Sequence, residues 1–296
     1  MDLTIYLAEK RALVDDALKG LMPDLKGPTS ELFRAMNYSL FAGGKRLRPI
    51  LCVAGAEAVG GEGMDALPVA CALEMIHTYS LIHDDLPAMD NDDMRRGKAT
   101  SHKVFGEALA ILAGDGLLTE AFNVMTGPDL IEKLGAARFQ EIISLISAAA
   151  GCRGMVGGQT ADIMMEGKEI DPSQLDFIHK HKTGALISAS VSSGAIVGGG
   201  SRRELGDIAI YGDKIGLAFQ ISDDILNVEG DSEEMGKRAG SDAQKRKNTY
   251  PSVYGMERSK RILKDLVDEA VNSLKEFGRK ADPLRQIAGY IIERKR

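Results

Sequence analysis

The sequence predicts an all-α protein, built as a bundle of long helices around a central cavity. Apolar residues recur at helical spacing through most of the 296 residues, whereas the alternating pattern of half-buried strands is scarce. Glycine and proline at 127–128, 151–158, 171–172 and 198–200 separate the helical segments. No Pro-rich, Gly/Ser-rich or low-complexity stretch divides the chain, so we predict a single domain over residues 1–296.

The predicted helices differ in how much apolar surface they carry. Residues 2–19 place Leu3, Leu7 and Val14 on one face among charged residues, as an amphipathic helix does. Residues 66–86 are almost continuously apolar, which is typical of a buried helix. Further helices are expected at residues 107–125, 130–150, 174–197, 204–228 and 256–277.

The composition limits the function classes. A formal net charge of −6 argues against a general nucleic-acid binder, which needs a basic face. The N-terminus carries charge without a following apolar core, and no apolar run approaches the ~18–20 residues of a membrane span, so we expect neither a signal peptide nor a membrane span. Cys52, Cys71 and Cys152 lie in apolar surroundings and are expected to be buried free thiols of a cytoplasmic protein.

Two aspartate-rich segments lie far apart in the chain, and each is followed by basic residues. The first runs from His83 to Gly97 and the second from Gln220 to Asn227. Carboxylates at this density repel one another unless a cation lies between them, and Mg²⁺ with oxygen ligands and substrate phosphates is the expected one. Neighbouring Arg and Lys side chains can neutralise phosphate oxygens that the metal does not reach. The sequence therefore predicts a metal-bound diphosphate.

The spacing within each segment predicts how the side chains converge. Gln220, Asp223 and Asn227 follow i, i+3, i+7 spacing and should share one helix face. Asp84 and Asp90 are off helical register, with a proline between them, and a bulged helix end could bring Asp90 back beside Asp84. Both pairs are expected at the C-terminal ends of apolar helices, where anions are disfavoured and a bound metal could offset the cost.

These motifs, taken in order, resemble those of the trans-isoprenyl diphosphate synthases, specifically the short-chain bacterial farnesyl diphosphate synthases. The resemblance covers nearly the whole chain and implies the isoprenoid-synthase-type helical bundle. The matching segments are Gly43–Pro49 (GGKRLRP), residues 74–97, Lys182-Thr183, Phe219-Gln220, Asp223-Asp224, and Gly236-Lys237 with Asp242, Lys247 and Thr249-Tyr250-Pro251.

The resemblance implies a role for each motif. Three Mg²⁺ ions, which Mn²⁺ could replace, would bind the allylic diphosphate; the implied metal ligands are Asp84, Asp85, Asp90, Asp223 and Asp224. The same diphosphate would be held by Arg95, Lys182, Lys237 and Lys247. The diphosphate of isopentenyl diphosphate would be bound by Lys45, Arg48, His77 and Arg96.

The implied chemistry is ionisation, condensation and elimination. Lys182, Thr183 and Gln220 are the implied catalytic residues, because the oxygens of Thr183 and Gln220 can offer partial negative charge to an allylic cation without attacking it irreversibly. Structural interpretations remain open for some of these residues: His77 could be a core histidine, and Gln220 could be a buried amide. His179 and His181 are spaced wrongly for one helix face, so we predict no metal site there.

One position departs from the family pattern. The second motif usually ends in Asp, and here Asn227 holds that place. Asn keeps an acceptor oxygen but loses a charge, so we predict an active enzyme with Asp223 as the direct ligand. Whether the lost charge lowers the Mg²⁺ affinity is left open by the sequence.

Tyr79 and Ser80 are the predicted determinants of product length. Tyr79 lies five residues before Asp84, about 7.5 Å along a helix, where its ring would close the tunnel for the growing chain. By resemblance, this arrangement goes with a C15 product, although Ser80 is better aligned with Asp84 by helix geometry. A core aromatic with no gating role is the alternative for Tyr79.

Other readings of the whole chain remain. A geranylgeranyl diphosphate synthase is the nearest alternative. A class I terpene cyclase is more remote, because it would lack the basic site at Lys45 and Arg48. A non-catalytic prenyl synthase subunit and a Mg²⁺-binding regulatory protein are also more remote. By resemblance, the chain forms a homodimer, with residues 107–125 supplying part of the interface. The terminal Arg294-Lys295-Arg296 could close over the site or be a frayed tail.

Overall fold

The computed structural model describes residues 1–22, 26–229 and 248–293. Three sequence predictions therefore lie outside the described residues: Lys237, Lys247 and the terminal basic residues 294–296.

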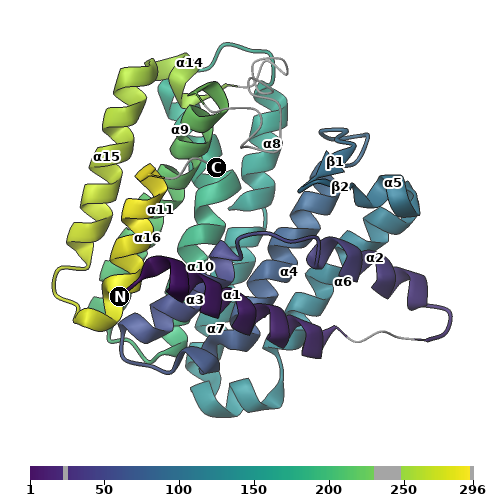
Figure 1. Cartoon of the computed structure of the whole chain (residues 1–296), viewed down its shortest axis with the longest axis horizontal. Helices are drawn as coiled ribbons and strands as arrows, with labels where there is room; N and C mark the ends of the chain where they lie inside the picture. The colour runs from purple at the N-terminus through teal and green to yellow at the C-terminus, as the bar shows by residue number, and fades with distance from the viewer. Residues whose placement is uncertain (23–25, 230–247, 294–296) are drawn as a thin grey trace.

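The described chain is a bundle of helices with one small hairpin (Figure 1). The first half comprises α1 Leu3–Leu21, α2 Ser30–Leu40, α3 Leu47–Ala58, the 3₁₀ turn η1 Gly63–Ala66, α4 Leu67–Asp84, β1 Met94–Arg95, β2 Lys98–Ala99, α5 Ser101–Phe105 and α6 Glu107–Met125. The second half comprises α7 Pro128–Ala150, α8 Met155–Met165, α9 Pro172–His179, the π-helical turn η2 Lys180–Gly184, α10 Ala185–Val197, α11 Arg202–Glu229, α14 Tyr250–Tyr254, α15 Met256–Ser273, η3 Arg279–Ala281 and α16 Asp282–Glu293. The all-α prediction is confirmed.

The long predicted helices all occur close to the expected residues, but several helices were missed. Among these, α8 was read as a break because it contains Gly157 and Gly158. A Cβ on Gly158 would lie 2.1 Å from the backbone nitrogen of Lys182. Glycine here permits a close approach between helices instead of ending one, and propensity alone cannot distinguish these two uses.

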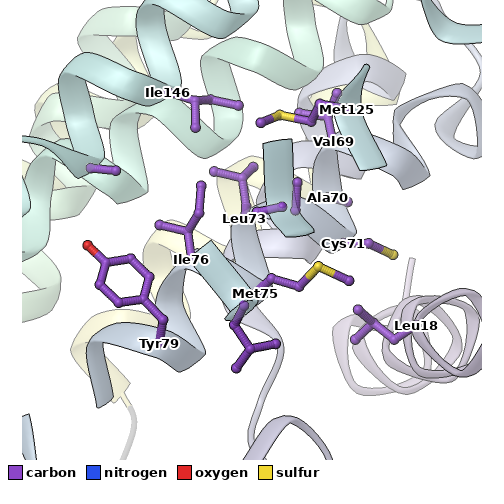
Figure 2. Close-up of a cluster of buried hydrophobic side chains, with 14 of the residues drawn as sticks. Leu18, Val69, Ala70, Cys71, Leu73, Met75, Ile76, Tyr79, Met125 and Ile146 are labelled. Carbon is purple, nitrogen blue, oxygen red and sulfur yellow. The ribbon is translucent and has the colours of Figure 1, made fainter. Parts of the chain in front are cut away.

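Helix α4 lies at the centre of the larger buried cluster, as its apolar composition predicts. Figure 2 shows Val69, Leu73, Ile76 and Tyr79 projecting from α4 among side chains of α1, α6 and α7. The second cluster joins α3, α10, α11, α15 and α16. Glycines bring α3 and α10 together, because a Cβ on Gly194 would lie 1.8 Å from the carbonyl oxygen of Cys52. Because protein cores are close-packed, these two clusters hold the backbones of α4 and α11 in fixed positions.

Two sequence predictions need correction. Cys152 is exposed in the turn between α7 and α8, whereas Cys52 and Cys71 are buried as expected; all three thiols are free. Helix α6 is long and apolar enough, by length and composition alone, to cross a membrane, contrary to the expectation that no segment comes close. This is weak evidence, because a core helix of a water-soluble protein passes the same test.

Candidate active site

The two aspartate pairs lie on α4 and α11, which run toward the same end of the molecule (top of Figure 1). There the β1–β2 hairpin, α8 and α14 surround them. We call the α4 end with the hairpin the first wall, and η2 with the adjoining part of α11 the second wall. Asp85 is the C-cap of α4, as predicted. Asp223 and Asp224 lie near the end of the described part of α11, which reaches Glu229, close to the predicted end at residue 228.

The chain after α4 turns back as the spacing of its carboxylates suggested. The backbone N–H of Asp90 donates to the carbonyl oxygen of Asp84 at 2.8 Å. Asn91 closes the turn with a left-handed φ of 51° and donates to the carbonyl of Leu86 at 3.1 Å. The predicted return of Asp90 to Asp84 is thus present in the backbone.

Asp85 is bound to a cation of its own wall. It is buried, and Arg95 on β1 donates from Nε to both carboxylate oxygens at 2.7 and 2.8 Å. Burial opposes the charge of this guanidinium, but the hydrogen bonds and negative charge of Asp85 raise the pKa of Arg95 overall. The pair fixes the hairpin to the end of α4.

In the loop before α3, Arg46 turns toward the core. There it binds Glu74 and Asp15 at 2.8 Å each, so it stabilises the packing of α1 against α4. Gly43 and Gly44 adopt φ of 95° and 127°, which suits glycine.

Arg96 of the hairpin occupies the space that Gly44 leaves. A Cβ on Gly44 would lie 2.6 Å from Nη1 of Arg96, and the same guanidinium donates to the carbonyl of Gly43. Arg96 itself has a left-handed φ of 53°, followed by Gly97 at 75° in the hairpin turn. Glycine at 44 therefore positions a cation that comes from another motif.

A cavity of about 460 Å³ joins the predicted diphosphate-binding residues to the second wall. Its lining includes Lys45, Arg48, His77, Arg96, Thr183, Phe219, Gln220 and Asp223. The sequence prediction that the four basic side chains share a site is consistent with this lining, and the structure adds that they face Thr183, Gln220 and Asp223 across one space.

Two basic side chains of this cavity are strongly desolvated, although the carboxylates of Glu74 and Asp223 also line it. Burial lowers the pKa of Arg48 to about 10, and its Nε is buried without a hydrogen-bond partner among the described residues. Burial, followed by the positive charges of Arg48 and Arg96, lowers the pKa of His77 well below its usual value. Such a site favours an anion with several acceptor oxygens.

The second wall carries Lys182 and the hydrogen-bonded side chains of Thr183 and Gln220. Lys182 and Thr183 lie in the π-helical turn η2, a feature frequent at functional sites. The Lys182 ammonium contacts Asp162 of α8 at 2.6 Å. Thr183 donates to Oε1 of Gln220 at 2.8 Å, and Gln220 donates from Nε2 to Oδ1 of Asp224 at 3.0 Å.

Asp224 is buried, and both of its carboxylate oxygens accept hydrogen bonds, although it also lines a pocket of about 120 Å³ together with Lys182. Its Oδ2 lies 2.8 Å from Nε2 of His179 and accepts the backbone N–H of Tyr250 at 2.9 Å. His179, for which the sequence suggested no role, thus contacts the second aspartate pair.

Two side chains of α8 in the site were missed by the sequence reasoning. Gln159 donates to Oδ1 of Asp84 at 2.8 Å, and Asp162 pairs with Lys182. Their i, i+3 spacing on one helix face was a usable signal, obscured because Gly157 and Gly158 suggested a break. Helix α8 therefore connects the two walls.

The donor chemistry fits Mg²⁺ held jointly with a substrate. The described residues contain no group of three or more His, Cys, Asp or Glu side chains placed to hold a metal ion by themselves. Mg²⁺ is commonly bound by one or two carboxylates together with substrate phosphates, so carboxylates divided between two walls suit it.

Tyr79 is buried on α4 and backed by His83. The two rings meet edge to face, with centroids 5.8 Å apart. His83 lies over Gly114 of α6, where a Cβ would be 2.1 Å from its Nε2, and this nitrogen lies 3.0 Å from the carbonyl of Ile111. Ser80 donates to the carbonyl of His77 at 2.9 Å.

Known proteins resemble this chain in sequence and architecture. A family model described as polyprenyl synthetase matches residues 29–282. A farnesyl diphosphate synthase of Geobacillus stearothermophilus is 48% identical over 288 residues, covering 97% of this chain and 95% of that one. A geranylgeranyl diphosphate synthase of Cyanophora paradoxa is 46% identical over 294 residues, covering 99% and 97%. The solved structure of an FPP/GFPP synthase from Zymomonas mobilis matches with a TM-score of 0.87 at 36% identity, covering 98% of each chain.

Proposed function

Because the chain belongs to the polyprenyl synthetase family, we propose that it is a prenyltransferase that makes farnesyl diphosphate. It condenses isopentenyl diphosphate with dimethylallyl diphosphate and then with geranyl diphosphate. The observation that carries the proposal is the cavity that joins the basic group of Lys45, Arg48 and Arg96 to Thr183 and Gln220. A terpene cyclase has no need of this second anion site.

The allylic diphosphate lies between the two walls. Asp84, Asp85, Asp90 and Asp223 are the proposed ligands for three Mg²⁺ ions, although Asp85 already accepts hydrogen bonds from Arg95. The family resemblance also implies Asp224 as a ligand, but both of its carboxylate oxygens accept hydrogen bonds from protein donors. Bound Mg²⁺ would stabilise the negative charge that develops on the departing diphosphate.

Protein cations complete both anion sites. Arg95 and Lys182 bind the allylic diphosphate, with Lys237 and Lys247 as further proposed contacts outside the described residues. Lys45, Arg48, His77 and Arg96 bind the diphosphate of isopentenyl diphosphate. Arg48 contributes a buried donor that lacks a partner among the described residues, and an incoming diphosphate oxygen can satisfy it.

The space between the two anion sites is where carbon–carbon bond formation takes place. Lys182, Thr183 and Gln220 are the proposed catalytic residues. The oxygens of Thr183 and Gln220 lie 2.8 Å apart at the cavity wall and offer negative charge to the allylic cation. The double bond of isopentenyl diphosphate attacks this cation, and a proton then leaves to the departed diphosphate.

Product length follows from the first wall. We infer that Tyr79, with Ser80 beside it, closes the tunnel at C15, and that His83 supports the Tyr79 ring. Geranylgeranyl diphosphate synthase is the second candidate, since a relative of that name matches over nearly the whole chain.

The assembly and location remain proposals. The exposed apolar residues Ile111 and Leu112 on α6 support a homodimer that covers this helix. Three free thiols support the cytoplasm as its location. Residues 1–296 form one domain.

A single incubation tests the function. The protein is mixed with radiolabelled isopentenyl diphosphate, dimethylallyl diphosphate and Mg²⁺, and the dephosphorylated products are sized by chromatography. We expect a C15 product that requires both substrates and disappears with EDTA. A C20 product would select the second candidate, and no prenyl product would overturn the proposal.

A further inference from the structure

The geometry points to Asp224 and His179 as positioning residues that decide which end of the Gln220 amide faces the reacting cavity. This inference rests on the proposed function, because it concerns the orientation of a residue that touches the allylic cation. It assigns Asp224 a role through Gln220 in place of direct metal binding.

The hydrogen-bond chain has a direction that its chemistry determines. An ionised carboxylate can only accept hydrogen bonds, so Gln220 must present its NH₂ group to Oδ1 of Asp224, at 3.0 Å. The carbonyl oxygen of Gln220 is then turned the other way, and the Thr183 hydroxyl donates to it at 2.8 Å. The carboxylate thus turns the acceptor oxygen of Gln220 away from itself and toward Thr183. Thr183 and Gln220 both line the main cavity as well as a smaller pocket with Lys182 and Asp224, and we infer that the oxygen faces the reacting allylic group there.

Asp224 is held in place from three elements. Its Oδ2 meets the His179 ring from α9 and the Tyr250 backbone N–H from α14, while Gln220 on its own helix takes Oδ1. Since the carboxylate accepts only, Nε2 of His179 carries the proton in this contact. The His179 ring also packs against the Tyr250 ring, with centroids 5.3 Å apart. The carboxylate is buried, so rotation away from these donors would leave several of them unsatisfied.

The amide orientation has a direct consequence for the reaction. With Oε1 toward the cavity, the amide dipole stabilises a positive charge; with NH₂ toward the cavity, it opposes that charge. In ground-state binding of the diphosphates the difference is small, because their oxygens are bound elsewhere in the site. The orientation therefore affects kcat more than KM.

Asp224→Asn reverses the direction of these hydrogen bonds, because each donor must meet an acceptor. The two donors at Oδ2 keep the amide oxygen of the new side chain on their side, so its NH₂ group replaces Oδ1 and faces Gln220. Two NH₂ groups cannot bond each other, and Gln220 must flip. The matched control is Asp213→Asn, on the same helix, where the exposed carboxylate accepts the Ser188 hydroxyl at 2.7 Å.

The experiment is a double-mutant cycle with a Mg²⁺ titration. We expect Asp224→Asn to lower kcat by about 10²-fold, with KM for both substrates and the half-saturating Mg²⁺ concentration within about twofold of wild type. In a Gln220→Leu background the same substitution should cost less than about threefold, because nothing remains to be oriented. Asp213→Asn should match wild type.

His179 supplies an independent variant if Asp224→Asn folds poorly. His179→Leu removes the donor and should lower kcat about tenfold, whereas His179→Gln restores an N–H donor and should recover most of the rate. Circular dichroism and thermal unfolding establish that each variant is folded. The inference is overturned if Asp224→Asn raises the half-saturating Mg²⁺ concentration tenfold or more, or costs as much without Gln220 as with it. A wild-type protein that forms no prenyl product contradicts the proposed function itself.

Discussion

The two aspartate pairs look alike in the sequence but differ in what their second members contact. In the first wall, buried Asp85 binds the Arg95 guanidinium of the hairpin through both oxygens. In the second wall, buried Asp224 accepts from His179, Gln220 and the Tyr250 backbone, which belong to three different elements. We propose that the first arrangement positions a cation for a diphosphate and that the second orients the Gln220 amide. Two aspartates with the same sequence position in their pairs are therefore held by different partners, a guanidinium in one case and amide, imidazole and backbone donors in the other.

Removing the first member of the second pair should have the largest effect. Asp223 lines the main cavity opposite the basic side chains. Asp223→Ala should lower the rate by about 10³-fold or more, because a carboxylate that supports the leaving diphosphate is lost. The measurement is C15 formation across a Mg²⁺ titration.

Asn227→Asp is the complementary change on the same helix. It should retain activity and lower the Mg²⁺ concentration that gives half the maximal rate, since it restores a charge to the second wall. A fully active Asp223→Ala variant would show that the second wall does not bind the metal through Asp223.

Breaking the Asp85–Arg95 pair tests the first wall. Asp85→Asn removes the charge that fixes Arg95, so the guanidinium can shift by an ångström or more and kcat/KM for the allylic substrate should fall about 10²-fold. The free energy of unfolding should fall by about 2 kcal/mol, the usual contribution of hydrogen bonds to a charged group. Steady-state kinetics and urea unfolding measure the two effects.

Asp93→Asn serves as the control for that pair. Asp93 lies in the same segment, and its exposed carboxylate binds Lys103 at 2.8 Å. It should change neither quantity by more than about twofold or 0.5 kcal/mol. If Asp85→Asn behaves like Asp93→Asn, the first wall does not position its cation through this pair.

Substitution of Gly44 tests how the Arg96 guanidinium of the hairpin is positioned. Gly44→Ala puts a Cβ 2.6 Å from Nη1 of Arg96, so the guanidinium must move and KM for isopentenyl diphosphate should rise about tenfold. Gly43→Ala imposes similar backbone strain but meets nothing within 4 Å. It should affect KM less, and equal effects would attribute the loss to backbone strain instead of Arg96.

Tyr79 tests whether the first wall also determines product length. Tyr79→Ala should shift the product from C15 toward C20 or longer, because the ring that closes the tunnel is removed. His83→Ala should shift it in the same direction but less, since His83 only backs the ring at a centroid distance of 5.8 Å. Product sizing by chromatography measures both, and an unchanged C15 product from Tyr79→Ala would refute the gating role.

Much of this fold could be predicted from the sequence, because long apolar or amphipathic segments such as α4 and α6 carry their own helical signal. The different environments of Asp85 and Asp224 could not be predicted. Each follows an identical neighbour, and its partners come from segments distant in the chain, such as His179 and Tyr250. The sequence likewise could not show that Gly158 permits a close contact between helices, because the contact is with the backbone nitrogen of Lys182, which is distant in the chain.

His77 gives the smallest effect but tests the first wall in the absence of substrate. Burial, followed by the positive charges of Arg48 and Arg96, lowers its pKa well below the usual imidazole value of about 6.5. The folded protein keeps this ring neutral while the unfolded chain protonates it, so the unfolded state binds more protons below pH 6.5. Stability is therefore full above that pH and falls as the pH drops, by up to about 1.4 kcal/mol per unit for one proton.

The contribution of His77 is isolated by difference. Urea unfolding of wild type and His77→Gln between pH 7.5 and 5 should give a shallower slope for the variant, because other groups titrate equally in both. Inorganic pyrophosphate should shrink the difference: a diphosphate beside Arg48 and Arg96 cancels the positive field that keeps the ring neutral. Equal slopes without pyrophosphate would show that neither burial nor these cations lower the pKa of His77. A difference that pyrophosphate leaves unchanged would show that pyrophosphate does not bind beside Arg48 and Arg96, so the two measurements test both the environment of His77 and the proposed anion site.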